Sequence, residues 1–298
     1  MDFLGLPSYS WETVLGSAIS GVFLGSVYAL VALGLTLIYG VLHIINFAHG
    51  AMLMLAMYAV FFLWSALGID PYLALLIVVP AGFVFGYALQ RGVIGRFSHG
   101  RDEITLLVTL GIAIMIENGA LFAFSATERQ VQVPYDFDGI DFGVTFAVWP
   151  EIAALAGSLV VTLALWLFMT RTDMGHAIQA VAKERRGAEL VGIDVEHIYG
   201  VTFGIGAACV AVAACLLAPT YAVSPQFGYL FVLIAFTVVV LGGMGSFVGA
   251  LVGGFLIGIT EQLGRLYLGE SLGLITISAI FILVLLFRPT GLFGQASG

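Results

Sequence analysis

Apolar stretches long enough to cross a bilayer recur along almost the whole chain, and they constrain its fold more than any other feature. A helix needs about 20 apolar residues to span the hydrocarbon core. Composition agrees, because 61% of the 298 residues are hydrophobic and 9% are charged. A soluble domain carries roughly 25% charged residues, so this chain has too few to cover a surface in water. The stretches lie at about 14–40, 47–67, 72–90, 104–125, 148–170, 198–218 and 272–288.

One further apolar stretch, roughly 229–264, is too long for a single crossing and is interrupted by the sequence GGMGS at 242–246. Glycine is disfavoured inside helices and common where they end, so two helices are expected here, the first of them short. A second interruption, with polar residues between apolar runs, lies near 40–50. The predicted fold is all-α: a polytopic membrane protein with about eight to nine transmembrane helices, broken or short near 40–50 and 229–246. It forms a single transmembrane domain over 1–298.

Basic residues are distributed unevenly between the predicted connections, and this orients the chain. Cytoplasmic loops of membrane proteins carry an excess of Lys and Arg. With nine spans, eight of the ten basic residues fall on one side, and Arg129 and Arg265 fall on the other. The prediction places the N-terminus and the acidic 125–150 connection outside and the C-terminus in the cytoplasm. The eight residues are Arg91, Arg96, Arg101, Arg171, Lys183, Arg185, Arg186 and Arg288.

The segment at about 171–197 is the longest predicted cytoplasmic connection and the most polar part of the chain. Small and apolar residues recur within it close to helical period. This pattern indicates an amphipathic helix that docks in a groove of a soluble partner; the alternative is a solvated turn with a short helix. The candidate partner contacts, with a glycine that can end the helix, are Lys183, Glu184, Arg185, Arg186, Glu189 and Gly192.

Polar side chains interrupt the predicted spans at a few positions. Ionisable groups at membrane depth cost about 2.5–3.5 kcal/mol on insertion scales, so they usually face the bundle interior or an aqueous path. Each could instead make a helix–helix hydrogen bond or lie at the interface. The candidates for a translocation path or gate are Asn46, His49, Glu117, Asn118 and Gln262.

Glycines spaced four apart occupy one predicted span. Gly245, Gly249 and Gly253 form this series, and a similar spacing occurs at 21 and 25. Small residues at this spacing let helix backbones approach closely in lipid. The series therefore indicates helix packing.

Motifs of several other function classes are absent from the sequence. It contains no GxxxxGK[ST] phosphate loop, no HExxH and no GxSxG, and Lys183 is its one lysine. His43 and His49 are six residues apart with no carboxylate nearby, so we expect no metal site. Two function classes stay open on these residues: an ATP-independent carrier or channel, with Glu117 or Glu261 binding a coupling ion, and a membrane-embedded enzyme.

Four sequence blocks, in order, resemble the LivH-type permeases of branched-chain amino-acid ABC transporters. The first is GLTLIYG at 34–40, leading into INFAHG at 45–50. The second covers 174–193, the third is LGGMGS at 241–246, and the fourth is FRPTGLFG at 287–294. The resemblance covers most of the chain.

This resemblance implies the membrane subunit of an importer in a bacterial inner membrane, not an enzyme. Its expected partners are a second related or identical permease, two ATPase subunits and an extracytoplasmic solute-binding protein. No cofactor is expected in this chain, because ATP and magnesium would be bound by the ATPases, to which the 171–197 segment would couple. Branched-chain amino acids are the leading substrate, with urea, an amide or a small carboxylate as alternatives. One departure is Ala51, where the family commonly has an acidic residue.

Overall fold

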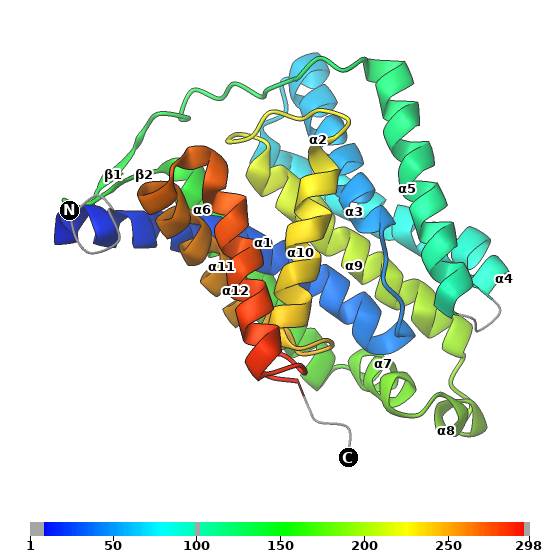
Figure 1. The fold of residues 1–298 in the computed structure, drawn as a ribbon. Coiled ribbons are helices and arrows are strands. Elements are labelled where there is room, and N and C mark those ends of the chain that lie inside the picture. The colour runs from blue at the N-terminus through cyan, green and yellow to red at the C-terminus, as the bar shows by residue number, and fades with distance from the viewer. Residues whose placement is uncertain (1–8, 99–101, 295–298) are drawn as a thin grey trace.

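The computed structural model describes residues 9–98 and 102–294, and these residues form an all-helical bundle with one small strand pair (Figure 1). Arg101, one of the residues used to orient the chain, lies outside the described residues. The long helices are α1 (Trp11–Leu42), α2 (Ala48–Leu67), α3 (Pro71–Leu89), α5 (Asp102–Phe124), α6 (Trp149–Arg171), α9 (Val195–Leu217), α10 (Phe227–Gly242), α11 (Phe247–Leu268) and α12 (Gly273–Phe287). The shorter elements are η1 (Gln90–Ile94), α4 (Gly95–Ser98), α7 (Asp173–Lys183), α8 (Arg185–Leu190) and η2 (Glu270–Leu272), and the strands are β1 (Gly139–Asp141) and β2 (Phe146–Val148).

Seven helical segments within the described residues are long and apolar enough to cross a membrane, and α10 and α12 are shorter apolar helices. The predicted polytopic all-α fold is confirmed. The expected division of the 229–264 stretch is also found, since α10 ends at Gly242 and α11 begins at Phe247. Ser246 caps the new helix by accepting a hydrogen bond from the Gly249 N–H at 3.0 Å. This bond satisfies one of the N–H donors that a helix start leaves without a partner.

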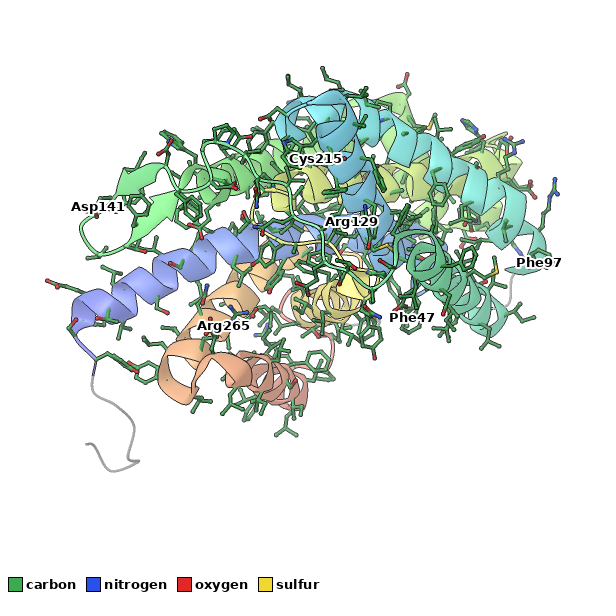
Figure 2. All side chains as sticks on the ribbon, turned by 90° about the horizontal axis from the view of Figure 1, so that it is seen from above. Phe47, Phe97, Arg129, Asp141, Cys215 and Arg265 are labelled. Atoms are coloured by element: carbon green, nitrogen blue, oxygen red, sulfur yellow. The ribbon has the colours of Figure 1, made fainter. Side chains whose placement is uncertain are left out.

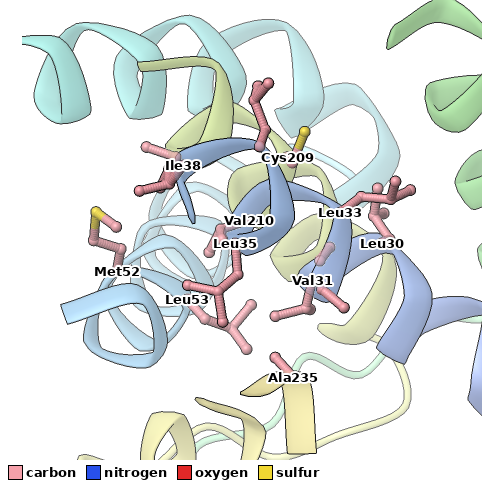
Figure 3. Close-up of a cluster of buried hydrophobic side chains, with 14 of the residues drawn as sticks. Leu30, Val31, Leu33, Leu35, Ile38, Met52, Leu53, Cys209, Val210 and Ala235 are labelled. Carbon is pink, nitrogen blue, oxygen red and sulfur yellow. The ribbon is translucent and has the colours of Figure 1, made fainter. Parts of the chain in front are cut away.

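Helix α1 is the axis of the bundle. It is the longest helix, at 32 residues, and 94% of its most apolar 18-residue stretch is buried. In the core its Leu30, Leu33 and Ile38 meet side chains from α2 and α9 (Figure 3). A helix that is apolar on all sides is expected inside a bundle, surrounded by other helices.

Glycine contacts hold α11 directly against α1. A Cβ atom on Gly25 would lie 2.7 Å from the Gly254 carbonyl oxygen, and one on Gly254 would lie 2.6 Å from the Ala29 Cα. Gly21 and Gly258 meet in the same way one turn further along. The two backbones therefore touch along a stripe of small residues, as membrane helices often do.

The connection between α5 and α6 is attached to the bundle. Arg129 and Val223 form an isolated antiparallel bridge, and the Tyr135 hydroxyl donates to Asp70 Oδ2 at 2.6 Å. The antiparallel pair β1–β2, with Gly139 opposite Val148, ends the connection. No sequence signal predicted this hairpin, because each strand has three residues and is too short to show an alternating pattern.

The polar segment after α6 forms two helices where one was expected. Thr172 caps α7 by accepting from the Gly175 N–H at 3.0 Å, and Ile178 and Val181 are buried. The chain then breaks at Glu184, which caps α8 in turn. Gly192 follows α8 with a φ of +89°, a conformation that favours glycine and ends the helical run.

Candidate translocation site

The break between α1 and α2 is built by local hydrogen bonds. Helix α1 ends because His43 adopts the left-handed conformation, with a φ of +56°, while its N–H still reaches the Tyr39 carbonyl at 2.8 Å. The chain resumes as α2 after Asn46, whose Oδ1 accepts from the Ala48 N–H at 3.1 Å. Asn46 is fully buried, and its Nδ2 has no partner among the described residues.

His49 lies in the first turn of α2 and points into α1. Its Nε2 is 3.0 Å from the Val31 carbonyl oxygen, so Nε2 carries the hydrogen and donates it. Nδ1 is buried and has no partner within the described part of the chain. This contact is the helix–helix hydrogen bond that the sequence left open as the alternative to a path residue.

Helices α5 and α10 close around the start of α2. Thr109 of α5 donates its hydroxyl to the Ile45 carbonyl at 3.3 Å. On the other side, a Cβ atom on Gly50 would lie 2.8 Å from the Gly228 carbonyl carbon of α10. The two glycines let α10 approach the broken segment at backbone distance.

A small cavity lies where these three helices meet. Its volume is about 110 Å³, which is room for about four water molecules. Figure 2 shows Phe47, one of its lining residues, between α5 and α10. Glu117 supplies the carboxylate of this cavity, and Ala51 lies in the same wall. The lining residues are Phe47, Ala51, Ala113, Glu117, Pro225, Gly228, Tyr229, Val232 and Leu233.

The structure does not bring all predicted path residues to this cavity. Asn118 is exposed on α5, and its Nδ2 donates to the Ile114 carbonyl of its own helix at 2.8 Å. Gln262 is half-buried on α11, where its backbone carbonyl accepts from the Ser17 hydroxyl at 3.0 Å. Asn46 and His49 are buried beside the cavity's Phe47, and Glu117 lines the cavity.

A buried carboxyl group on α11, that of Glu261, was considered from the sequence only as a coupling-ion ligand in the carrier alternative. Glu261 is 1% exposed; its Oε2 accepts from the Tyr28 hydroxyl of α1 at 2.7 Å, and its Oε1 pairs with the guanidinium of Arg265. The Nε of Arg265 is buried without a partner among the described residues. The spacing of four between Glu261 and Arg265 is a sequence signal for this pair, whereas the contact with Tyr28 is not visible in the sequence.

The predicted partner contacts lie together on α7 and α8. The Arg185 guanidinium is 3.1 Å from Glu189 Oε1 and lies over the Tyr199 ring at 5.8 Å. The hydrogen bond to Glu189 raises the pKa of Arg185, which stays charged. Lys183, Glu184 and Arg186 are exposed.

A larger cavity of about 320 Å³ separates this segment from the bundle. It extends from the end of α1, at His43 and Ile44, to Lys183, Glu184 and Arg185. Gln90 of η1 also lines it, and the Gln90 Oε1 is buried without a partner among the described residues. The cavity therefore lies between the α1–α2 break and the helices α7 and α8.

The predicted packing glycines have different surroundings. Gly249 and Gly253 of α11 face α10, and a Cβ atom on Gly253 would lie 3.0 Å from the Val238 carbonyl oxygen. Gly245 lies in the turn before α11 with a φ of +83°, and a Cβ atom there would be 3.5 Å from the Gly40 Cα. In residues 9–98 and 102–294, no group of three or more His, Cys, Asp or Glu side chains could hold a metal ion.

A helix bundle with a broken helix pair, irregular backbone buried in protein, and a carboxylate in a cavity at membrane depth has the features of a membrane transport protein. Comparison with known proteins gives the particular family. Residues 17–287 match the family model described as "Branched-chain amino acid transport system / permease component", and the chain belongs to this family.

Similar proteins cover almost the whole chain. It is 34% identical over 295 residues to the high-affinity branched-chain amino acid transport system permease protein BraD of Pseudomonas aeruginosa, covering 94% of this chain and 96% of that protein. It is 35% identical to the corresponding protein LivH of Escherichia coli K12, covering 93% and 94%. The LivM permease protein of Salmonella typhimurium is 24% identical over 89% of this chain and 67% of its own length. No solved structure matches the chain.

Proposed function

We propose that this chain is the membrane-spanning permease subunit of an ABC importer that carries branched-chain amino acids into the cytoplasm across the inner membrane. The observation that carries the proposal is the family match over 17–287, together with 34% identity to BraD over nearly full length. This membership favours the ATP-driven permease over an ATP-independent carrier. The α1–α2 break and the cavity beside it are the part of the bundle through which the solute would pass.

ATP would be hydrolysed by two partner ATPase subunits, and α7 and α8 would transmit their movement. The inner face of α7 is anchored in the bundle by Ile178 and Val181. At the tip of the segment, Leu190 and Val191 are 88% and 78% exposed beside charged Arg186. Exposed apolar side chains flanked by charges suit the groove of a soluble partner.

The second permease would pack on the free face of α5. Asn118 is exposed there, well inside the helix, and a Cβ atom on Gly111 or Gly119 would meet nothing within 4 Å. An exposed amide at membrane depth is costly against lipid but can hydrogen-bond to another helix, and small residues allow that helix to approach closely. A related permease chain is the partner that supplies such a helix.

The orientation proposed from the charges puts α7 and α8 in the cytoplasm. Figure 1 draws α7 and α8 at the end of the molecule where α12 finishes, away from the long connection between α5 and β1. The basic residues of α8 and Arg288 thus share one end. The opposite end, with the β1–β2 hairpin, would face the extracytoplasmic binding protein.

Purification from the native membrane in mild detergent tests the assembly. We expect two ATPase chains and a second permease to accompany this chain, and solute uptake by liposomes to require ATP. Replacing Arg185 and Arg186 together by Ala should reduce ATPase association while the membrane helices stay folded. A chain that purifies alone and moves solute without ATP would refute the proposal.

Competition during uptake tests the substrate. Leucine, isoleucine and valine should compete, whereas urea, short amides and small carboxylates should not. Ala51 makes this test necessary, because the usual acidic residue is missing from the wall of the cavity. If the three amino acids do not reduce uptake, they are excluded as substrates, but the proposed importer assembly is not contradicted.

A further inference from the structure

We propose that the carboxylate of Glu117 binds the ammonium group of the transported solute, in the cavity between α2, α5 and α10. This inference rests on the proposed function and names a residue that selects the substrate within it. The proposal follows from the charge of Glu117, its missing partner and the apolar walls around it.

The first observation is that Glu117 has no counter-charge. Glu117 makes no hydrogen bond or ion pair with any described residue. The two ion pairs among the described residues are Arg185–Glu189 and Arg265–Glu261. Glu261, the other acidic group inside a long apolar helix, has both a hydroxyl and a guanidinium partner. An ionisable group at membrane depth without a partner is a sign of a functional site.

The second observation is the depth of Glu117 in the membrane. Helix α5 has 23 residues, and Glu117 lies seven residues before its end at Phe124, or about 10 Å along the axis. The hydrocarbon core is about 30 Å thick, so the carboxylate lies inside it. The side chain is half-buried and reaches an open cavity, which gives a solute access to it.

The third observation is the chemistry of the walls. Apart from Glu117 and the Tyr229 hydroxyl, the lining side chains carry no polar atoms, and they include Phe47, Val232 and Leu233. A metal ion would need several oxygen or nitrogen ligands, which this set lacks. One carboxylate beside aliphatic walls is instead complementary to a cation that carries a small apolar body. An amino acid with a branched aliphatic side chain has this chemistry.

The position of Ala51 adds to this reading. Ala51 is 8% exposed, and it lines the same cavity as Glu117 from the facing helix α2. Its methyl group brings no charge, so the negative charge available to the solute comes from α5.

The test uses the complete transporter in proteoliposomes, with its ATPase, second permease and binding protein. Glu117→Gln should lower ATP-driven leucine uptake by about ten- to a hundredfold, the effect of losing a hydrogen bond between charged groups. Copurification of the partner subunits with the variant checks its assembly. Leucine uptake within about twofold of the unchanged protein would overturn the proposal.

A cysteine variant separates charge from shape. Glu117→Cys should also transport poorly. A methanethiosulfonate reagent that attaches a sulfonatoethyl group should restore part of the uptake, and one that attaches a trimethylammonium-ethyl group should not. Because the reagent is added after purification, this comparison tests the role of the negative charge even if Glu117→Gln fails to assemble. Equal effects of the two reagents would refute a role for the negative charge.

The matched control is Ser65→Cys near the end of α2, which is exposed and does not line the cavity. We expect both reagents to react there without a difference that depends on their charge. The native thiols of Cys209 and Cys215 are 4% and 0% exposed, so background labelling should be low. If the unchanged complex shows no ATP-driven uptake of any amino acid, the proposed function fails; if it transports leucine and the Glu117 variants transport equally well, only the ammonium site fails.

Discussion

Removing the Tyr28 hydroxyl tests whether the bundle core holds the buried carboxyl group of Glu261. Glu261 is 1% exposed, and its Oε2 accepts from the Tyr28 hydroxyl at 2.7 Å. A hydrogen bond to a charged group contributes about 1.5–3 kcal/mol, against about 0.5–1.5 kcal/mol for a bond between neutral groups. Tyr28→Phe should therefore lower the free energy of unfolding by about 1.5–3 kcal/mol. Arg265 remains as a partner, but its side chain is 37% exposed, so water screens this ion pair and it adds less.

A double-mutant cycle gives the sharper form of this prediction. With Glu261→Gln in place, the same Tyr28→Phe change should cost only about 0.5–1.5 kcal/mol, because the acceptor is now neutral. Thermal unfolding in detergent provides the measurement, with a thiol-reactive dye reporting exposure of the buried Cys209 and Cys215. Tyr28→Phe alone should lower the midpoint by roughly 3 °C or more.

The cycle can refute the reasoning in two ways. An equal cost of Tyr28→Phe in both backgrounds would mean that the charge of Glu261 does not strengthen the bond. A cost below about 0.5 kcal/mol in both would mean that Tyr28 contributes no net hydrogen bond at all.

Three further predictions test separate parts of the structure. Gly254→Ala should destabilise the chain by about 1–3 kcal/mol, because the added methyl group would force α1 and α11 apart. Its control is Gly119→Ala, which has open space around it and should be neutral or stabilise the chain by up to about 1 kcal/mol. Thermal unfolding of the two variants distinguishes them. Leu190→Asp should reduce copurification of the ATPases without changing the unfolding midpoint, since Leu190 is 88% exposed. Tyr135→Phe should change the pH dependence of stability. Burial, and to a lesser extent the hydrogen bond to Asp70, raises the pKa of Tyr135 above 10.0. As the pH rises, the unfolded chain therefore loses the Tyr135 proton before the folded chain does. The stabilisation by Tyr135 should be constant below pH 10 and decline above it, as measured by unfolding at a series of pH values.

Local features of the fold were predictable because each depends on neighbours in the sequence. Helix α2 was expected at 47–67 and spans Ala48–Leu67, since a run of apolar residues sets its length. The glycine-rich 242–246 segment separates α10 from α11 as expected. The conformation of Gly243 and Gly245, with φ of +102° and +83°, explains why glycines stand there.

Contacts between distant segments were not predictable in the same way. The spacing of small residues marked Gly21 and Gly25 as packing positions, but it could not show that they pack against Gly258 and Gly254 of α11. Tyr28 and Glu261 are 233 positions apart, and neither sequence neighbourhood points to the other. Glu117 was a candidate because of its charge in an apolar span. Its place in one cavity with Ala51 depends on how α2, α5 and α10 meet, which is a property of the tertiary structure.

The unequal burial of the helices indicates which part of the bundle can move during transport. In helix α1, 94% of the most apolar 18-residue stretch is buried, and the glycine contacts hold α11 against it at backbone distance. In helix α5, 17% of the corresponding stretch is buried, and this helix packs mainly against α2, with α4 and η1 near its N-terminal end. Local opening costs least where few apolar contacts must be broken. Opening of the Glu117 cavity by displacement of α5 therefore requires less free energy than any separation of α1 from α11, and α5 also carries the free face on which we propose that the second permease binds.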